Sequence, residues 1–363
     1  MIIILSAPTP DNLAQLTRIL KDHGYDAHLS KGVETTLVGA VGAMQSNEEK
    51  ADLMEQIASL PYVDKVVPVA KPYKLVNRQF HPEPTVVEVR GVKIGDPSSL
   101  VVMAGPCTVE TEEQLMLSAR AVKKAGAHIL RGGAFKPSTS PYSFHGHGET
   151  ALKMLAAARE ELDMPIITEV MDARDVDMVC RYADILQIGT RNMTNFTLLR
   201  EVGECRTPVM LKRGMAALIE EYLQAAEYIA SRGNYQIILC ERGIRTFENS
   251  YRNCFDVNAI PTLKELSHLP VIGDPSHGTG KRSIVPAIAK AAVAAGADGL
   301  MLEAHHAPEQ ALKDGAQSLT LPAFAALMPE LERIANAVDR TMNLPSDQPR
   351  EFAGATSGNG ASR

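Results

Sequence analysis

The stretch VVMAGPCTVETEEQLMLSARAVKKAGAHILR, residues 101–131, carries the pattern that decides the fold. An apolar run, Val101–Ala104, is followed by an amphipathic segment, Glu112–Lys124, and then by a second short run that ends at Arg131. Short apolar runs indicate buried strands, and apolar residues three or four positions apart indicate a helix. This stretch therefore predicts a strand, a helix and a second strand in succession.

The same alternation continues toward the C-terminus. Apolar runs predict eight strands, at Val101–Ala104, His128–Arg131, Pro165–Glu169, Asp184–Ile188, Pro208–Lys212, Gln236–Cys240, Pro270–Asp274 and Gly299–Glu303. Helices are predicted between them, at Glu112–Lys124, Thr150–Glu161, Asp172–Tyr182, Asn195–Val202, Leu218–Arg232 and Ile284–Ala295. Eight such units over about 250 residues predict an α/β fold of the (β/α)8 TIM barrel type. A doubly wound open sheet is the alternative, but it usually has fewer strands and often a glycine-rich turn after its first strand.

The first 70 residues form a separate pattern. Strands are expected at Ile2–Ser6, Ala27–Ser30, Thr35–Val41 and Val63–Val67, with a helix capped by Thr9 or Asp11 and a second helix at Glu48–Ser59. The order βαββαβ is that of a small ferredoxin-like domain. The predicted organisation is this domain at 1–70, a linker and barrel-closing hairpin at 71–98, the barrel at 99–343 and a disordered tail at 344–363.

Composition excludes several classes of function. The chain has 363 residues, with 37 Lys and Arg against 43 Asp and Glu and a net charge of −6, so no basic surface for nucleic acid is expected. No apolar run approaches the ~18 residues of a membrane span, and the apolar start lacks a basic leader. Five cysteines is an odd number, which favours reduced thiols in the cytoplasm over a disulfide framework.

Reactive side chains stand at or just after the C-terminal ends of the predicted strands, which form the active face of such barrels. One set is cationic, namely Arg131, Lys136, Arg191, Lys212 and Arg242. A chain of net negative charge that collects cations at one rim is expected to bind a highly charged anion such as a phosphate ester. For any single residue a solvated surface cation is the simpler interpretation, but the number at separate strand ends favours a site.

A second set of side chains is suited to a metal ion. It consists of Cys107, His277, Glu303 and Asp314. One thiolate, one imidazole and two carboxylates are compatible with Mn, Fe, Co, Zn or Cu. These residues are far apart in the sequence, and a cysteine alone is more often a small buried apolar residue, so the prediction depends on the barrel bringing them together.

Several short motifs resemble those of the 3-deoxy-D-arabino-heptulosonate 7-phosphate (DAHP) synthases. In chain order they are Ala104-Gly105-Pro106-Cys107, Leu130-Arg131-Gly132-Gly133-Ala134-Phe135-Lys136-Pro137, Gln187-Ile188-Gly189-Thr190-Arg191-Asn192, Leu211-Lys212-Arg213-Gly214, Cys240-Glu241-Arg242-Gly243-Ile244-Arg245-Thr246, Asp274-Pro275-Ser276-His277 and Glu303-Ala304-His305. The resemblance is to the type I beta branch and covers residues 98–340 in order and spacing. The N-terminal unit resembles a regulatory extension of that branch.

The resemblance implies an activity and a set of residue roles. The activity is a metal-dependent condensation of phosphoenolpyruvate with erythrose 4-phosphate and water, the first step of the shikimate pathway to aromatic amino acids. One divalent metal ion would be held by Cys107, His277, Glu303 and Asp314. Phosphoenolpyruvate would be held by Arg131, Lys136, Arg191, Lys212 and Arg242. The aldose phosphate would be held by Pro137, Ser138, Thr139 and Asp274. The catalytic residues would be Lys136 as proton donor, Glu169 as the group that positions water, and His277.

One motif departs from the family pattern. The chain has Lys136-Pro137-Ser138-Thr139 where the family commonly has Lys-Pro-Arg-Thr. A guanidinium is therefore missing from the expected aldose-phosphate site, and weaker binding of the aldose is expected. Arg282, or an arginine of a neighbouring subunit, is the expected compensation.

Two other functions remain open at this stage. One is 3-deoxy-D-manno-octulosonate 8-phosphate (KDO8P) synthase, which performs the same reaction on arabinose 5-phosphate. The other is a barrel that has lost catalysis and serves as a binding subunit. The Lys136–Thr139 segment and the N-terminal unit favour DAHP synthase. The resemblance also implies tyrosine or phenylalanine as an effector at the N-terminal domain, and a homotetramer.

Overall fold

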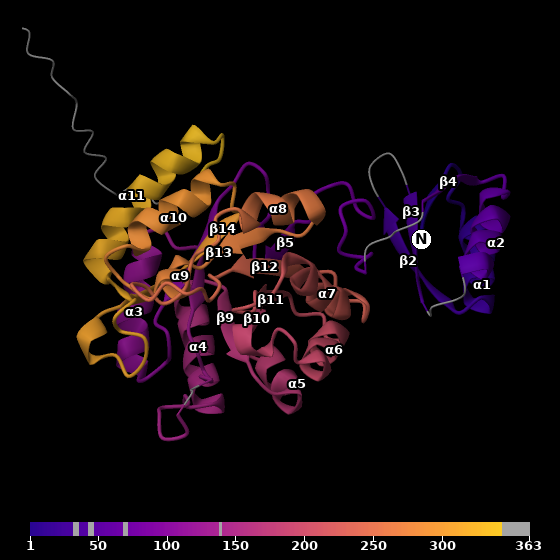
Figure 1. Ribbon diagram of the computed structural model, residues 1–363. Helices are drawn as coiled ribbons and strands as arrows, with labels where there is room; N and C mark the ends of the chain where they lie inside the picture. The colour runs from indigo at the N-terminus through magenta and orange to yellow at the C-terminus, as the bar shows by residue number, and fades with distance from the viewer. Residues whose placement is uncertain (32–35, 43–46, 68–71, 138–139, 343–363) are drawn as a thin grey trace, which may run out of the picture.

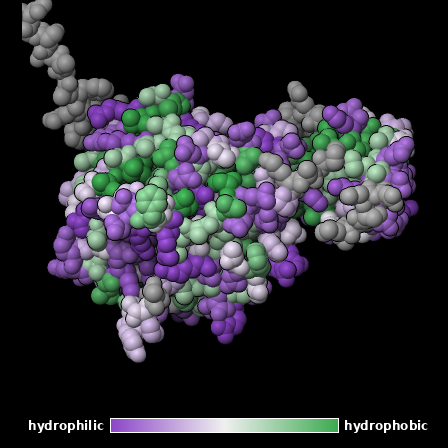
Figure 2. Space-filling model, viewed as in Figure 1, coloured by the Kyte–Doolittle hydropathy of each residue, from purple (hydrophilic) through white to green (hydrophobic). Residues whose placement is uncertain are grey.

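The protein is described here by a computed structural model that covers residues 1–31, 36–42, 47–67, 72–137 and 140–342. Figure 1 shows a small N-terminal lobe, in indigo, beside a larger lobe built from the rest of the chain. Figure 2 shows that the visible surface of both lobes mixes hydrophilic and hydrophobic residues. In the part of the chain that the structure describes, no helix is long and apolar enough to cross a membrane.

The small lobe is a four-stranded antiparallel sheet with the strand order β2-β3-β1-β4. Its elements are β1 (Ile2–Leu5), α1 (Pro10–Asp22), β2 (Tyr25–Lys31), β3 (Thr36–Gly42), α2 (Asn47–Ala58) and β4 (Val63–Val67). Helix α1 begins where the Thr9 side chain accepts a hydrogen bond from the backbone N–H of Asn12. Its buried side chains, Leu16 and Leu20, share one core with Ile3 of the sheet.

The large lobe is a closed barrel of eight parallel strands, because β14 pairs with both β13 and β7. The strands are β7 (Val101–Gly105), β8 (Ile129–Arg131), β9 (Ile166–Val170), β10 (Ile185–Ile188), β11 (Val209–Lys212), β12 (Ile237–Glu241), β13 (Val271–Gly273) and β14 (Gly299–His305). A short strand, β15 (Leu319–Thr320), pairs with the end of β14. Strands that are buried on both faces appear in the sequence as continuous apolar runs, and the predicted fold class is confirmed.

Helices surround the barrel (Figure 1). They are α3 (Glu112–Lys124), α4 (Glu149–Leu162), α5 (Val176–Cys180), α6 (Phe196–Glu204), α7 (Ile219–Ala230), α8 (Ala259–Leu266), α9 (Pro275–Thr279), α10 (Val285–Ala294) and α11 (Leu321–Ala337). Short 3₁₀ turns are η1 (Ala173–Asp175), η2 (Thr190–Asn192) and η3 (Pro308–Gln310). The single helix expected at Asp172–Tyr182 is divided into η1 and α5. Helices α8 and α11 were not predicted, because Pro261 and Pro329 interrupt their sequence pattern.

A hairpin fills one end of the barrel. Strands β5 (Val87–Val89) and β6 (Val92–Ile94) place Val87, Val89 and Ile94 in one apolar cluster with inward-facing residues of the barrel strands, among them Val101 at the start of β7. The hairpin turn uses Arg90 and Gly91, both with positive φ. Because the strand starts are packed with apolar side chains, polar chemistry is confined to the other end.

Candidate active site

A cavity of about 310 Å³ lies at the C-terminal ends of the barrel strands. Its charged and reactive lining residues are Cys107, Arg131, Lys136, Glu169, Arg191, Lys212, Arg242, Arg252, His277, Lys313 and Asp314. Seven of these are lysines or arginines, in a chain whose net charge is −6. Such a concentration of positive charge in a concave site attracts anions.

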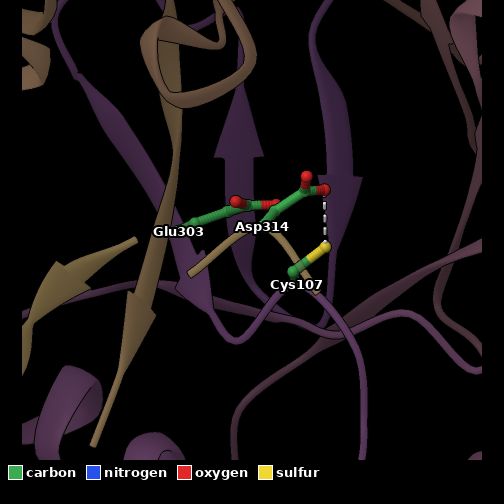
Figure 3. A group of neighbouring side chains, drawn as sticks. All are labelled: Cys107, Glu303 and Asp314. Carbon is green, nitrogen blue, oxygen red and sulfur yellow. Dashed lines mark hydrogen bonds between the residues drawn. The ribbon is translucent and has the colours of Figure 1, made fainter. Parts of the chain in front are cut away.

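A thiol and two carboxylates meet at one edge of this cavity (Figure 3). Cys107 follows β7, Glu303 lies on β14, and Asp314 lies in the turn after η3. One ligand atom from each lies within 4.8 Å of the others. The Cys107 Sγ donates a hydrogen bond to Asp314 Oδ2 at 3.2 Å. A thiol and carboxylates in this arrangement form a donor set that suits a divalent metal ion.

Asp314 is held in an uncommon backbone conformation. Its φ is +53°, in the left-handed region that non-glycine residues rarely adopt. The Asp314 carbonyl accepts hydrogen bonds from the backbone N–H of Gln317 at 3.1 Å and from the hydroxyl of Ser318 at 3.2 Å. A Cβ at Gly315 would collide with the carbonyl oxygen of Pro308. This tight turn therefore projects the carboxylate into the cavity.

His277 lies beside the cluster, in α9 directly after β13. The Asp274 carboxylate caps α9 by accepting a hydrogen bond from the backbone N–H of His277, and its Oδ2 lies 2.8 Å from Nδ1 of the ring. The other ring nitrogen, Nε2, lies 3.3 Å from Glu303 Oε1. Burial lowers the pKa of His277 to about 4, although the carboxylates of Asp274 and Glu303 oppose that shift. The imidazole is therefore neutral at pH 7, the form that binds metal ions.

Buried charges set the ionisation of the cluster. Burial raises the pKa of the Cys107 thiol, and the negative Glu303 adds to this. Burial alone would raise the pKa of Asp314, but Lys136, His277 and Arg252 together outweigh it and lower the pKa below its ordinary value. Lys136 Nζ lies 2.8 Å from both Cys107 Sγ and Asp314 Oδ2. The Lys136 ammonium therefore offsets negative charge at the Asp314 carboxylate and beside the Cys107 thiol.

The remaining cations enter the cavity from separate strands. Arg131 NH1 donates to the carbonyl of Pro106 at 2.7 Å and lies 3.3 Å from Glu303 Oε1. Lys212 Nζ donates to Asp274 Oδ2 at 2.5 Å. Arg242 is 2% exposed, and burial lowers its pKa. Guanidinium and ammonium groups held in this way are positioned before any ligand binds, which reduces the entropy cost of binding.

Glu169 lies at the base of the cavity, on β9. Its Oε2 accepts a hydrogen bond from the Gln187 amide at 3.0 Å. Its Oε1 has no hydrogen-bond partner among the described residues, and a Cβ at Gly189 would collide with this atom. Burial raises the pKa of Glu169 above its ordinary value, although Lys136 and Lys212 oppose the shift. A carboxylate with one uncommitted oxygen is suited to accept a proton or to hold water.

Sequence comparison identifies the family to which this site belongs. Residues 75–338 match the profile described as the DAHP synthetase I family, and residues 1–71 match a DAHP synthase ferredoxin-like domain. The chain belongs to the DAHP synthetase I family. The predicted membership of the DAHP synthases, which are enzymes, is therefore confirmed.

Named relatives within this family cover most of the chain. A phospho-2-dehydro-3-deoxyheptonate aldolase of Thermotoga maritima is 44% identical over 344 residues, which is 94% of this chain and 100% of the relative. The crystal structure of the DAHP synthase of Thermotoga maritima superposes with a TM-score of 0.74 at 43% identity, covering 94% of this chain and 99% of that chain. A 2-dehydro-3-deoxyphosphooctonate aldolase of Syntrophotalea carbinolica is 31% identical over 269 residues, 69% of this chain and 96% of the relative.

The structure brings most of the predicted DAHP synthase residues to one cavity. The four metal-binding candidates lie together, and the five predicted phosphoenolpyruvate cations all line the cavity, as does Pro137. Ser138 and Thr139 lie outside the described residues. Asp274 is fully buried beneath Lys212 and His277 and does not line the cavity.

Arg282 does not line the cavity either, because its guanidinium donates to Glu309 and to the carbonyl of Gly315.

The sequence analysis missed several polar residues at this site, among them Arg252, Lys313 and Gln317. Arg252 and Lys313 line the cavity, and Gln317 donates a hydrogen bond to Glu303 Oε2 at 2.7 Å. None of them immediately follows a barrel strand, so the positions of the strand ends did not predict them. The available signal was their position in the long loops after β12 and β14, since loops at this end of a barrel build its active site.

Proposed function

We propose that the chain condenses phosphoenolpyruvate with erythrose 4-phosphate and water to give DAHP and inorganic phosphate, the first step of the shikimate pathway. The observation that carries this proposal is the cavity in which cations from separate strands face a thiol, an imidazole and carboxylates. Family membership and the name of the Thermotoga maritima relative support this choice of reaction.

Five cations would hold phosphoenolpyruvate, a small molecule with a phosphate and a carboxylate. They are Arg131, Lys136, Arg191, Lys212 and Arg242. Guanidinium groups bind planar or tetrahedral oxyanions through paired N–H donors, and ammonium groups add point charges. Binding at several points fixes the orientation of the enol carbon, and this ordering lowers the barrier for a reaction between two substrates.

One divalent metal ion would be held by Cys107, His277, Glu303 and Asp314. The donors fit such an ion, because thiol and carboxylate ligand atoms lie within 4.8 Å of one another and His277 Nε2 lies 3.3 Å from Glu303. The mixture is compatible with Mn, Fe, Co or Zn. When bound, the ion would supply Lewis acidity at an aldehyde oxygen and orient the aldose.

The chain's own residues supply the proton transfers in the proposed reaction. C3 of phosphoenolpyruvate forms a bond to the aldehyde carbon, the carbonyl electron pair moves to oxygen, and Lys136 Nζ delivers a proton there. Water then adds to C2 and loses a proton, for which Glu169 Oε1 is the proposed acceptor. Cleavage of the bond between C2 and the phosphate oxygen, with transfer of the C2 hydroxyl proton to the departing phosphate, releases inorganic phosphate and leaves a ketone. These roles fit the position of both side chains on the cavity wall.

A phosphate-release assay tests this proposal. Purified protein should release phosphate from phosphoenolpyruvate when erythrose 4-phosphate is present, should lose this activity with a chelator, and should regain it with added Mn²⁺. Activity that depends only on arabinose 5-phosphate would establish KDO8P synthase, the alternative that the Syntrophotalea carbinolica relative favours at lower identity and coverage. No release with either aldose would indicate a binding subunit without catalysis.

The ferredoxin-like domain is proposed to bind a regulatory ligand, with tyrosine and phenylalanine as the candidates. Its support is the match of residues 1–71 to a DAHP synthase ferredoxin-like domain. Regulation requires that the effector bind two states of the enzyme with different affinity. The same assay should therefore be slowed by one of these amino acids, and an unchanged rate with both would remove the regulatory proposal. A homotetramer remains the predicted assembly.

A further inference from the structure

Each carboxylate of the metal-site candidate uses its two oxygens differently. Asp314 Oδ2 faces the cluster, 3.2 Å from the Cys107 thiol and 2.8 Å from Lys136 Nζ. Glu303 Oε1 faces the same region, 3.3 Å from His277 Nε2. The second oxygen of each carboxylate points elsewhere, and two side chains to which the proposed reaction gives no role bind these outer oxygens.

Arg252 and Gln317 form this outer layer. Arg252 NH1 donates to Gln317 Oε1 at 2.9 Å and lies 3.4 Å from Asp314 Oδ1. Because Arg252 occupies the Gln317 oxygen, the amide nitrogen of Gln317 is directed to Glu303 Oε2, to which it donates at 2.7 Å. A single guanidinium thus connects both carboxylates, one directly and one through the buried amide.

The backbone around Arg252 is anchored against α9, the helix that carries His277. The backbone N–H of Arg252 donates to the carbonyl of Thr279 at 2.9 Å. The next side chain, Asn253, donates to the carbonyl of His277 at 3.0 Å and is 5% exposed. Ile244 and Cys254 pair across the loop as an antiparallel bridge. The loop is therefore held at several points, and the backbone position from which Arg252 contacts Asp314 is fixed.

We propose that Arg252 and Gln317 are positioning residues that hold the carboxylates of Asp314 and Glu303 with one oxygen of each facing the cluster, an inference that rests on the proposed metal site. Partners that bind the outer atoms of metal ligands restrict the ligand rotamers and are commonly needed for tight binding. Here the restriction acts on two ligands from two segments, so one arginine in a distant loop orients both carboxylates of the donor set.

Metal affinity of the apoenzyme tests the inference directly. Calorimetric titration with Mn²⁺ should show that Arg252→Met binds the ion about 10- to 100-fold more weakly than the wild type, and that the near-isosteric Gln317→Met is about 10-fold weaker. The thermal midpoint of apo Arg252→Met should stay within about 2 °C of the wild type, because its side chain is 38% exposed. At saturating Mn²⁺, phosphate release by Arg252→Met should return to within a few-fold of the wild-type rate.

The matched control is Arg245→Met. Arg245 lies in the same loop and makes no ion pair with the described residues. Its substitution should leave the Mn²⁺ affinity unchanged. Wild-type affinity in both Arg252→Met and Gln317→Met would overturn the inference and leave the proposed function standing. Wild-type affinity with slow turnover at saturating metal would also overturn it, because Arg252 would then act on substrate. A wild-type protein that binds no divalent ion would refute the proposed metal site and this inference together.

Discussion

At the scale of single residues, Glu169 is a buried carboxylate of the cavity wall with one oxygen that lacks a partner among the residues the structure describes. It is 8% exposed, one oxygen is bound by Gln187, and the other has no hydrogen-bond partner in the described ranges 1–31, 36–42, 47–67, 72–137 and 140–342. Burial raises its pKa, and a carboxylate with a raised pKa is a stronger base at neutral pH. Gly189 provides the space for the uncommitted oxygen, since a side chain there would collide with it.

Substituting Glu169→Gln tests its role in proton transfer. The glutamine side chain has the same shape as the glutamate but cannot accept the proton from water. The kcat should therefore fall about 10²- to 10⁴-fold, while the KM for phosphoenolpyruvate should change little. In the wild type, activity should fall as pH decreases through the raised pKa of Glu169, because protonation removes the base. The activity of Glu169→Gln should not show this decrease at low pH. The control is Asp172→Asn, which changes a partly exposed carboxylate in the loop after β9. A variant with kcat within twofold of the wild type would exclude Glu169 from the mechanism.

Individual site residues were predictable where they follow a strand. Arg131 and Lys212 end β8 and β11, so a strand pattern alone locates them at the active rim. Asp314 does not follow a predicted strand directly, and its place beside Cys107 depends on a tight turn with positive φ that the sequence pattern does not predict. Arg252 was not predicted, since it acts from a long loop whose path depends on backbone hydrogen bonds to α9. Loop paths depend on tertiary contacts that periodicity does not encode.

At the scale of elements, the barrel strands were the most predictable part of the fold. Each is buried on both faces and gives a short apolar run, so its limits were found within one or two residues. Most predicted helices also matched, but the helix predicted at Asp172–Tyr182 is divided by local capping. The Asp172 carboxylate accepts a hydrogen bond from the backbone N–H of Arg174 and forms the 3₁₀ turn η1 ahead of α5. The helix pattern continues through this point, but the hydrogen bonding changes.

The ends of α5 and α6 bring two cysteines together. Cys180 is the last residue of α5, Cys205 follows α6, and the two side chains interact. The interaction with the Cys205 side chain lowers the pKa of Cys180 to about 7, although burial opposes the shift. Burial raises the pKa of the Cys240 thiol in β12. Cys180 is therefore expected to be more reactive than Cys240, since the thiolate is the nucleophile.

Alkylation followed by peptide mass spectrometry measures this difference. Iodoacetamide labelling of Cys180 should be half-maximal in rate near pH 7, while Cys240 remains unlabelled in the folded protein. Cys205→Ala removes the neighbouring thiol and should shift the Cys180 labelling profile toward higher pH by about one to two units, the direction of an ordinary thiol. Cys254→Ala is the control and should not shift it. An unshifted profile in Cys205→Ala would contradict the proposed interaction.

At the scale of the whole molecule, the segment that precedes the hairpin of β5 and β6 is hydrogen-bonded to the outer part of the barrel. Glu227 of α7 accepts hydrogen bonds from the backbone N–H groups of Leu75 and Val76 at 3.0 and 3.1 Å. His268, in the loop between α8 and β13, has Nε2 at 2.8 Å from the Leu75 carbonyl and Nδ1 at 2.7 Å from the Thr85 hydroxyl. The small lobe is thus connected to the barrel through a segment that depends on buried polar contacts.

The neutral state of His268 makes the stability of this connection sensitive to acid. Burial lowers its pKa to about 4, from an ordinary value of 6.5 that applies in the unfolded chain. As pH falls below 6.5 the unfolded state takes up a proton that the folded state does not, so the free energy of unfolding decreases until the folded pKa is reached. Between pH 7 and pH 5, protonation of this one group in the unfolded state should lower the free energy of unfolding by about 2 kcal/mol.

Urea unfolding should show that His268→Gln, which retains a donor for Leu75, loses less stability between pH 7 and pH 5 than the wild type. The exposed His147→Gln should behave as the wild type does. An unchanged pH slope in His268→Gln would show that the histidine is not kept neutral in the fold.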